Sequence, residues 1–382
     1  MADLKFKGEG VYIGLPEAEY FKPEALGSTD LATLYEDGEG WWWGSRHAPD
    51  WEPTETRPQA FGTAFHKLLL EGPDAFKAAY HVLPAPGSYD ELLRTVDDIK
   101  DALKVRGAPK PGSKANKPQL IEMAQIYIPD VPIWEAIVAE EHEKAEGRTV
   151  ISAADWAELE IMYECARRVP DLRELFITPK VRLPEISVFF YSEPIPGKGP
   201  VLCRFRFDGL YPMVTGDLKV VSSLRSFMDE VSYRMSEWKY RLQAGWSFYA
   251  RRMAYDQILA GRVFGGSASQ QEWIKRFPAQ APLDKVDWMW VFFQRPSKTG
   301  KAPAVLPVRL EHGHYIVQDG YQAARDALTV YVNCRETFGL KDPWFAAYHP
   351  MRVTMDRDPP QGWIRDREPQ NKPSHSHPPL TL

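Results

Sequence analysis

Residues 204–223 read RFRFDGLYPMVTGDLKVVSS and contain two apolar runs joined by a short segment with proline and glycine. Val, Phe, Leu and Thr are frequent in both runs, and most of these residue types favour extended strands. A similar run, ISVFFY (186–191), precedes them. With the two later runs bounded at 201–208 and 213–221, the sequence predicts three antiparallel strands connected as a meander.

Acidic residues stand in two of these predicted strands. Asp208 ends the second strand, and Asp217 lies inside the third, followed by Leu218 and Lys219. A hairpin would bring the aspartates together, and strand alternation places Asp217 and Lys219 on one face, with the Leu218 carbonyl near the acidic groups. Such oxygen ligands suit Mg²⁺, which usually takes one or two carboxylates together with water and substrate phosphate. The alternative is a turn beginning at Asp208 and an exposed Asp217–Lys219 pair without a ligand.

Helical and strand-like patterns alternate along the rest of the chain. Helices are predicted where apolar residues recur at helical spacing, and strands where short apolar runs are continuous. The helical segments are 54–71, 95–127 (two short helices around a basic loop), 153–168, 231–261 and 315–338, and the strands are 288–294 and 304–310. Pro307 inside the last strand predicts a sheet edge. The sequence therefore predicts a mixed α/β (α+β) fold.

Composition argues against several classes of protein. With 44% hydrophobic residues, 26% charged residues and a net charge of −5, the chain is typical of a globular protein. Its three cysteines are far apart, which argues against a disulfide framework, a cysteine zinc site and an iron–sulfur cluster. We find no signal peptide, membrane-length apolar segment, Gly-rich phosphate loop, Gly-x-Ser-x-Gly elbow or Cys-x-x-Cys. We expect an intracellular protein with no membrane partner.

The charges are unevenly distributed. Residues 1–60 contain 12 acidic and 5 basic side chains, and they include the tryptophan triplet 41–43. Residues 201–252 contain 9 basic and 5 acidic side chains, so this stretch is the first candidate for a nucleic-acid contact. The triplet would stack on DNA or plug a subunit interface, and we favour the interface. Residues 356–382 are rich in proline and charge and are predicted to form a flexible tail.

In several segments the sequence resembles the PD-(D/E)XK nuclease superfamily, and more closely the exodeoxyribonuclease VIII or RecE-type phage recombination exonucleases. The segments follow the family's order over about residues 60–340: FGTAFHKLLLEG (61–72), GRTVISAADWAELEIMYECARRVP (147–170), PEISVFF (184–190), CRFRFDGLYPMVTGDLKVVSS (203–223), WKYRLQAGWSFY (238–249) and YQAARDALTVYVNCRETF (321–338). The resemblance implies a restriction-endonuclease-like core, a central mixed sheet flanked by helices, over residues 61–350. Residues 1–60 are read as an N-terminal acidic, Trp-rich region, and 95–127 looks like a small helical insertion similar to SAP-type DNA-binding motifs.

The resemblance implies roles for the residues of the predicted hairpin. Asp208 and Asp217 match the family's metal-binding carboxylates, and the Leu218 carbonyl would be a further ligand. Lys219 matches the lysine that orients or helps to deprotonate the attacking water and stabilises charge on the phosphate.

Three residues outside the hairpin also match the family. His66 matches a helix histidine that binds or neighbours the metal, with an ordinary core histidine as the alternative. Glu185 matches a rim carboxylate that serves a second metal or a water, with a strand-edge charge as the alternative. Gln243, four residues before Ser247, would hold a catalytic water or a phosphate. A tyrosine often stands in the family where this chain has Ser247, so the substrate contact made there is in doubt.

Basic residues in two places are candidate DNA contacts. Arg204 and Arg206 share a face of their strand, which either meets the DNA backbone or is simply solvated. The loop of the helical insertion either binds phosphates or is a plain exposed loop, and its candidate residues are Lys110, Lys114 and Lys117.

The activity that the resemblance implies is Mg²⁺-dependent hydrolysis of linear double-stranded DNA, with Mn²⁺ able to substitute. Digestion from DNA ends in the 5′-to-3′ direction would leave 3′ single strands for recombination. The resemblance also implies a homo-oligomer, a single-strand annealing protein as partner, and a cytoplasmic product of phage or prophage origin. Two alternatives fit the same residues: a structure-specific endonuclease or single-strand nuclease of the superfamily, and a DNA-binding scaffold without catalysis.

Overall fold

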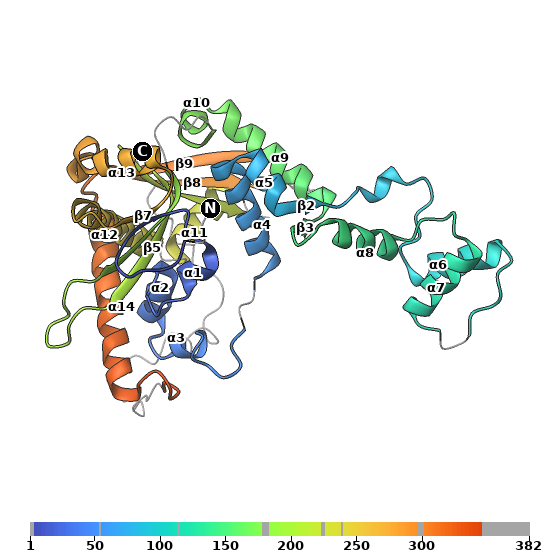
Figure 1. Ribbon diagram of the computed structural model, residues 1–382, viewed down its shortest axis with the longest axis horizontal. Helices are drawn as coiled ribbons and strands as arrows, with labels where there is room; N and C mark the ends of the chain where they lie inside the picture. Colours follow the sequence, from blue (N-terminus) through green and yellow to red (C-terminus); the bar gives the residue numbers. More distant parts are fainter. Residues whose placement is uncertain are drawn as a thin grey trace, which may run out of the picture.

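The computed structural model describes residues 4–52, 55–112, 115–177, 183–222, 226–237, 240–296 and 302–345. A main body is built around a sheet, and an arm comprising residues 93–133 projects from it (Figure 1). The predicted flexible tail, 356–382, and Lys114 lie outside the described residues.

The main body contains a seven-stranded sheet with helices on both faces. Its strands are β1 (Gly10–Ile13), β4 (Leu183–Tyr191), β5 (Leu202–Leu210), β6 (Val214–Val221), β7 (Val263–Gly265), β8 (Asp287–Gln294) and β9 (Ala304–Leu310). Its helices are α1 (Glu17–Phe21), α2 (Ser28–Glu36), α3 (Gly40–Trp43), α4 (Arg57–His66), η1 (Lys67–Glu71), α5 (Pro73–Ala79), α9 (Ala153–Arg168), α10 (Pro170–Leu172), η3 (Arg173–Ile177), α11 (Phe227–Glu237), α12 (Tyr240–Leu259), α13 (Ala268–Gln280), η4 (Leu283–Lys285) and α14 (Tyr315–Phe338). The short turn η2 (Pro86–Ser88) lies in the connection to the arm.

The strands follow the order β7-β1-β4-β5-β6-β8-β9. The three strands β4, β5 and β6 form the predicted antiparallel meander, and β8 then pairs with β6 in parallel after the chain has crossed over through α11, α12 and α13. The fold is therefore the mixed α/β architecture that the sequence predicts. β9 lies at the sheet edge, as Pro307 indicated, because proline cannot donate a ladder hydrogen bond.

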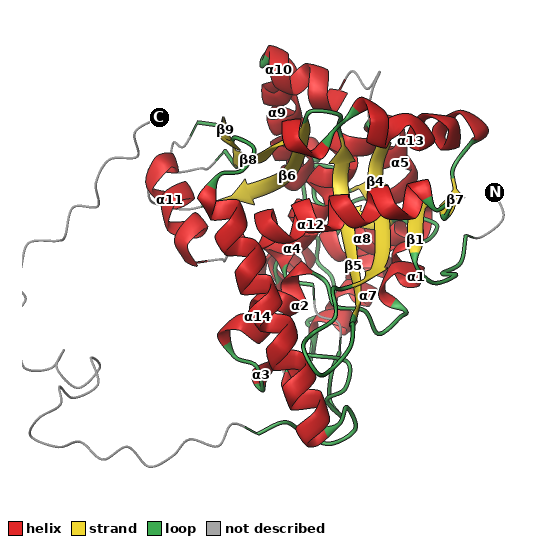
Figure 2. Ribbon diagram, turned by 90° about the vertical axis from the view of Figure 1, so that its left-hand side faces the viewer, coloured by secondary structure: helices red, strands yellow, loops and turns green. Residues whose placement is uncertain are grey.

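Strand β8 shows how the two faces are covered, because alternate side chains of a strand point to opposite faces. Met289, Val291 and Phe293 pack with side chains of α4 and α9, whereas Trp288, Trp290 and Phe292 pack with side chains of α12 and α14. All six are buried. Helices α12 and α14 lie across their face of the sheet in Figure 2. The strand that was predicted from WMWVFFQ is thus enclosed on both sides.

Two glycines allow α12 and α14 to touch backbone to backbone. A Cβ atom on Gly245 would lie 2.1 Å from the backbone nitrogen of Tyr321, and one on Gly320 would lie 1.7 Å from the carbonyl oxygen of Arg241. Real Cβ atoms do not come this close to backbone atoms, so only glycine fits at either position. The close approach fixes α12 against α14.

The arm has a small core of its own. Its helices α6 (Val96–Val105) and α7 (Lys117–Tyr127) bury a separate apolar cluster: Leu93, Ile99, Leu103, Leu120, Ala124, Ile128, Val131 and Ile133. The two ends of the arm meet, since the Leu93 amide donates to the carbonyl of Pro132 (3.0 Å) and the Trp134 amide to the carbonyl of Leu93 (2.9 Å). The arm is therefore closed on itself.

A slender neck joins the arm to the main body. It consists of the two-stranded parallel sheet β2 (Tyr80–Val82) and β3 (Thr149–Ile151) and the helix α8 (Trp134–Lys144). His81 on β2 lies 2.7 Å from the Glu141 carboxylate on α8. No side chain of α8 is buried, which is typical of a helix that bridges two parts of a molecule through solvent.

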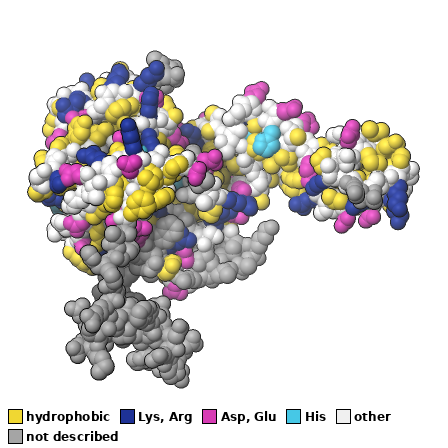
Figure 3. All heavy atoms as spheres, turned by 90° about the horizontal axis from the view of Figure 1, so that it is seen from below, with side chains coloured by type: hydrophobic (Ala, Val, Ile, Leu, Met, Phe, Trp, Pro, Cys, Tyr) yellow, Lys and Arg dark blue, Asp and Glu magenta, His cyan; other side chains and the backbone are white. Residues whose placement is uncertain are grey.

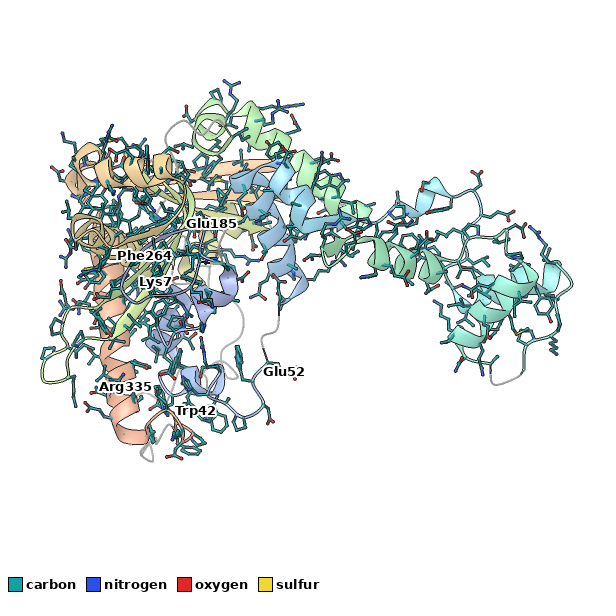
Figure 4. The ribbon with its side chains drawn as sticks, viewed as in Figure 1. Lys7, Trp42, Glu52, Glu185, Phe264 and Arg335 are labelled. Atoms are coloured by element: carbon teal, nitrogen blue, oxygen red, sulfur yellow. The ribbon has the colours of Figure 1, made fainter. Side chains whose placement is uncertain are left out.

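The tryptophan triplet corrects an expectation from the sequence. Trp41 and Trp42 are buried inside this chain, and Trp43 is half exposed. The Trp42 indole donates to the carbonyl of Leu340 (2.9 Å) and that of Trp43 to the carbonyl of Trp344 (2.8 Å), next to the end of α14 near Arg335 (Figure 4). Trp41 and Trp42 therefore form part of the core and are not available for a subunit interface or for stacking on DNA.

Most predicted elements occur at their expected positions. The helices at 153–168 and 315–338 match α9 and α14, and the helix at 54–71 is α4 continued by η1. The long helix at 231–261 corresponds to α11 and α12, with residues 238–239 between them outside the described part. Within the described ranges, no helix combines the length and the apolar character needed to cross a membrane.

Candidate active site

Three carboxylates lie at one level across neighbouring strands. In the pairing of β4 with β5, Pro184 lies opposite Gly209 and Ile186 opposite Phe207. The residues between them, Glu185 and Asp208, therefore lie opposite each other. The pairing of β5 with β6 ends at Gly209–Gly216, and its continuation by one residue sets Asp208 opposite Asp217. The row Glu185–Asp208–Asp217 therefore crosses the middle of the sheet. Figure 4 shows Glu185 inside the main body.

The backbone is irregular at this row. Glu185 has a φ of 54°, a left-handed conformation that residues other than glycine seldom adopt. Phe205, Phe207 and Leu210 all pack in the same core cluster, so the alternation of β5 breaks between Phe207 and Leu210. Irregularities of this kind re-aim side chains next to functional sites, and strained residues cluster there.

The Asp208 carboxylate contacts both β6 and α4. Its Oδ2 accepts a hydrogen bond from the backbone amide of Leu218 (2.8 Å), which takes the place of a ladder bond. His66, the last residue of α4, has its Nδ1 3.7 Å from Oδ1 of Asp208 and its Nε2 3.2 Å from the carbonyl oxygen of Leu218. The structure therefore brings together three of the predicted groups, an imidazole, a carboxylate and the Leu218 carbonyl.

Asp217 is contacted from the other side. Its Oδ2 lies 2.6 Å from Nζ of Lys219, and its Oδ1 accepts a hydrogen bond of 2.5 Å from Nε2 of Gln243 on α12. The Lys219 ammonium also lies 5.3 Å from the ring centre of Tyr240, one helical turn before Gln243. Tyr240 is a site neighbour to which the sequence gave no role, although it lies in the quoted segment WKYRLQAGWSFY (238–249), three residues before Gln243.

The environment raises the pKa of Glu185 to about 7. Burial is the largest cause, the neighbouring Asp208 carboxylate adds to it, and Arg206 opposes both. Arg206 lies 3.7 Å from the Glu185 carboxylate. Glu185 is therefore a carboxyl group that can exchange a proton near neutral pH.

The Asp217–Lys219 pair is held in a buried setting. Burial raises the pKa of Asp217, Asp208 adds to the rise, and Lys219 opposes it. Burial, the largest single effect, lowers the pKa of Lys219, but the neighbouring Asp217, Tyr240 and Asp208 together raise it above its ordinary value. Lys219 is therefore a cation at neutral pH in this state, and the Asp217 oxygen beside it is a position that attracts positive charge.

The donor atoms at the row fit a magnesium site that is completed by water and substrate. Two carboxylates and a backbone carbonyl are oxygen ligands of the type that Mg²⁺ takes, and Mg²⁺ seldom uses an all-protein cage. Within the described ranges, no group of three or more His, Cys, Asp or Glu side chains is arranged to hold a metal by itself. The protein would supply part of the coordination, from Asp208, Asp217 and Leu218, with His66 at its margin.

Arg204 and Arg206, the predicted DNA contacts on β5, are engaged within the chain. Arg204 is 7% exposed and lies 3.4 Å from the Asp30 carboxylate. Arg206 donates to Ser187 (2.9 Å) and to the carbonyl of Leu15 (3.0 Å). Both guanidinium groups stack near the Tyr20 ring. Arg206 contacts the candidate site through its ion pair with Glu185, whereas Arg204 lies further along the strand.

The predicted DNA contacts of the arm are far from the row. Lys110 is exposed, whereas Lys117 pairs with the Glu135 carboxylate and donates to the Arg94 carbonyl. Apolar and basic groups occur together at the free end of the arm (Figure 3), where Val105, Ile126 and Tyr127 are among the exposed apolar residues. The arm is therefore a second, separate place to test for DNA contact.

A cleft of about 1290 Å³ lies beside the site. Its walls include Thr63 and Ala64 of the helix that carries His66, and Arg204 of the strand that carries Asp208. Six acidic side chains and three arginines line it, so its charge does not favour a polyanion. Ser247, which stands in place of the family's tyrosine, is buried and donates to the Ala244 carbonyl (2.8 Å), so it cannot touch a substrate directly.

Comparisons with known proteins give limited information. No protein-family model matches the chain. No curated protein matches its sequence. Among solved structures, a protein named "Putative exonuclease" from Eubacterium rectale matches with a TM-score of 0.39 and 11% sequence identity, over 84% of this chain and 87% of that one. A structural similarity at this level does not identify a family, so the functional argument is based on the site itself.

Proposed function

We propose that the protein is a Mg²⁺-dependent deoxyribonuclease that hydrolyses linear double-stranded DNA from its ends. The observation that carries the proposal is the row Glu185–Asp208–Asp217 with Lys219 beside it, at a break in the regular sheet. Acidic oxygen ligands next to a buried cation are the groups that phosphodiester hydrolysis needs. The 5′-to-3′ direction, and a role in exposing 3′ strands for recombination, are proposed from the sequence resemblance alone.

Each residue of the site has a proposed part in the reaction. Asp208, Asp217 and the Leu218 carbonyl would hold Mg²⁺ (or Mn²⁺), which supplies an activated water and neutralises charge on the phosphate. Lys219 orients the water and places positive charge beside the phosphate oxygens. Gln243 fixes the Asp217 carboxylate by its hydrogen bond.

Glu185 is the proposed proton acceptor at the rim. Its raised pKa, about 7, lets it take a proton near neutral pH, where an efficient general base operates. Arg206 opposes full protonation from 3.7 Å away. A DNA partner, a single-strand annealing protein and self-association remain parts of the proposal that the sequence resemblance motivates.

The test uses purified protein with linear duplex labelled at the 5′ or 3′ end and with closed circular plasmid, in Mg²⁺, Mn²⁺ or EDTA. We expect loss of the 5′ label first, on linear DNA only and only with metal. The D217N variant should lose cleavage because a carboxylate ligand is gone, while circular dichroism shows a folded protein. Nicking of the circle would replace the proposal with an endonuclease. Binding without cleavage under every metal would leave a scaffold.

A further inference from the structure

A buried arginine outside the row forms hydrogen bonds with the turn that connects the two candidate metal-binding strands. Arg251 on α12 is fully buried, and among the described residues no carboxylate forms an ion pair with it. Its Nη2 donates to the carbonyls of Tyr211 (2.7 Å) and Pro212 (2.9 Å), and its Nη1 to the carbonyl of Val214 (3.2 Å) and the hydroxyl of Thr215 (2.8 Å). A buried charge needs such hydrogen bonds in place of water.

All four of these acceptors belong to one short stretch of chain. The stretch, residues 211–215, comprises the connection 211–213 between β5 and β6 and the first two residues of β6, and the ladder between these strands has only the pairs Gly209–Gly216 and Leu210–Thr215. Asp208 comes directly before the first of these pairs in β5, and Asp217 directly after it in β6. The turn to which Arg251 donates its hydrogen bonds therefore determines the relative positions of the two candidate metal-binding carboxylates.

The helix that carries Arg251 is itself well fixed. Gly245 and Gly320 let α12 press against the backbone of α14. Gln243 lies eight residues before Arg251 on α12, about 12 Å along the helix axis, and hydrogen-bonds Asp217. The helix therefore holds β6 at two points, one at the turn and one at the carboxylate.

We infer that Arg251 is a positioning residue, which holds Asp208 and Asp217 in the geometry that binds the metal. The inference rests on the proposed function, since it concerns the same site. Residues that orient metal ligands without touching the metal typically contribute 10- to 100-fold to metal affinity or activity. Arg251 acts through the backbone of the turn, and its fork of donors is what allows one side chain to bind several carbonyls.

The experiment compares R251M, R251K and T215V with the unmodified protein and with R295M. Arg295 is a matched control, because it is also largely buried but pairs with Asp155 and Glu158 of α9. Mn²⁺ binding is measured by electron paramagnetic resonance at a temperature where circular dichroism shows every variant folded. Cleavage of linear duplex is measured against Mg²⁺ concentration.

We expect R251M to bind Mn²⁺ about 10- to 100-fold more weakly. R251K should regain part of the loss, and T215V, which removes a single acceptor, should show a smaller effect. Raising the Mg²⁺ concentration should restore part of the cleavage by R251M. R295M should bind Mn²⁺ as the unmodified protein does, even if its melting temperature falls.

Unchanged Mn²⁺ affinity in folded R251M would overturn the inference while leaving the proposed function intact. If R251M does not fold, unchanged affinity in both R251K and T215V would overturn it equally. A loss of affinity of the same size in R295M would also overturn it, since general destabilisation would then explain the result. Absence of metal binding and cleavage in the unmodified protein would be the separate failure of the proposed function.

Discussion

Glu185 and Asp208 face each other on neighbouring strands, where two like charges repel. Burial and, after it, this repulsion raise the pKa of Glu185 to about 7, and part of the repulsion is avoided when Glu185 takes up a proton. The unusual backbone angle of Glu185 is a second unfavourable feature at the same residue. Residues that are unfavourable for folding but kept at a site of concentrated charge are typical of positions selected for chemistry.

The raised pKa of Glu185 predicts a pH-dependent effect on stability in EDTA. Between the ordinary glutamate pKa, about 4.3, and about 7, the folded protein binds more protons than the unfolded chain, so stability falls as pH rises through this window. E185Q has no such loss. The difference in melting temperature between the two proteins, E185Q minus unmodified, should therefore be more positive at pH 8 than at pH 5, as measured by calorimetry.

Glu193 provides the control for this measurement. Hydrogen bonding to Arg252 is the largest cause that lowers the pKa of Glu193, so its stabilising contribution is present above the ordinary pKa and is lost only towards acid. E193Q should lower the melting temperature by similar amounts at pH 5 and pH 8. A pH-independent difference for E185Q would contradict the assignment of its raised pKa.

At the scale of elements, the sequence predicted the meander β4–β5–β6, the buried β8, the edge strand β9 and the helices α9 and α14. Each has a strong local signal, either a continuous apolar run or a long helical stripe. It did not predict β1 and β7, short strands whose pairing depends on partners distant in the chain. It also gave no sign of the left-handed backbone at Glu185, because that strain is imposed by the surrounding sheet.

The candidate site, like the fold, was predictable only in part. The Asp208, Asp217 and Lys219 cluster followed from strand alternation, and His66 and Gln243 from the resemblance. The role of Arg251 could not be predicted, since an arginine in a helix is usually exposed. Most of its partners are atoms of residues 211–215, which no sequence pattern connects to it.

The close packing of α12 on α14 predicts opposite effects for two similar substitutions. G245A places a methyl group against the backbone at Tyr321 and should destabilise the protein by about 1–3 kcal/mol or more. G62A in the middle of α4 has open space around the new methyl group and should stabilise by about 0.5–1 kcal/mol. Urea unfolding of both variants tests this. A neutral G245A would mean that the two helices lie further apart.

The arm's closed ends predict that it can be removed. Leu93 and Ile133 form a bridge, so a short Gly-Ser linker can replace residues 94–132. The arm's apolar cluster is separate from the clusters around the sheet, and calorimetry should therefore show the main unfolding transition at an unchanged temperature. A large fall in that temperature would show that the main body depends on the arm.

On the scale of the whole molecule, the arm and the row of carboxylates are two separate places where DNA contact is proposed. Exposed lysines on the arm should then strengthen binding without taking part in cleavage. Lys104 and Lys110 are both exposed on the arm, and K104E/K110E should weaken binding of linear duplex and reduce the slope of log affinity against log salt by about 2. The binding is measured in EDTA, so that no DNA is cut.

The control for this variant carries the same change in net charge elsewhere. Lys275 and Lys285 are exposed on the main body, and K275E/K285E should alter affinity and salt dependence less. If the two double variants behave alike, the arm has no particular contact with DNA and only the overall charge matters.

The edges of the sheet bear on how molecules of this protein can associate. Pro307 lies within the ladder of β9 with β8, so the donor that it lacks is one that would have faced outward. At the other edge, β7 has only three residues. Neither edge offers a long row of free donors and acceptors, which protects concentrated protein from growing into stacked, fibre-like aggregates. If copies of this chain assemble, we expect the contact to form through helices and loops.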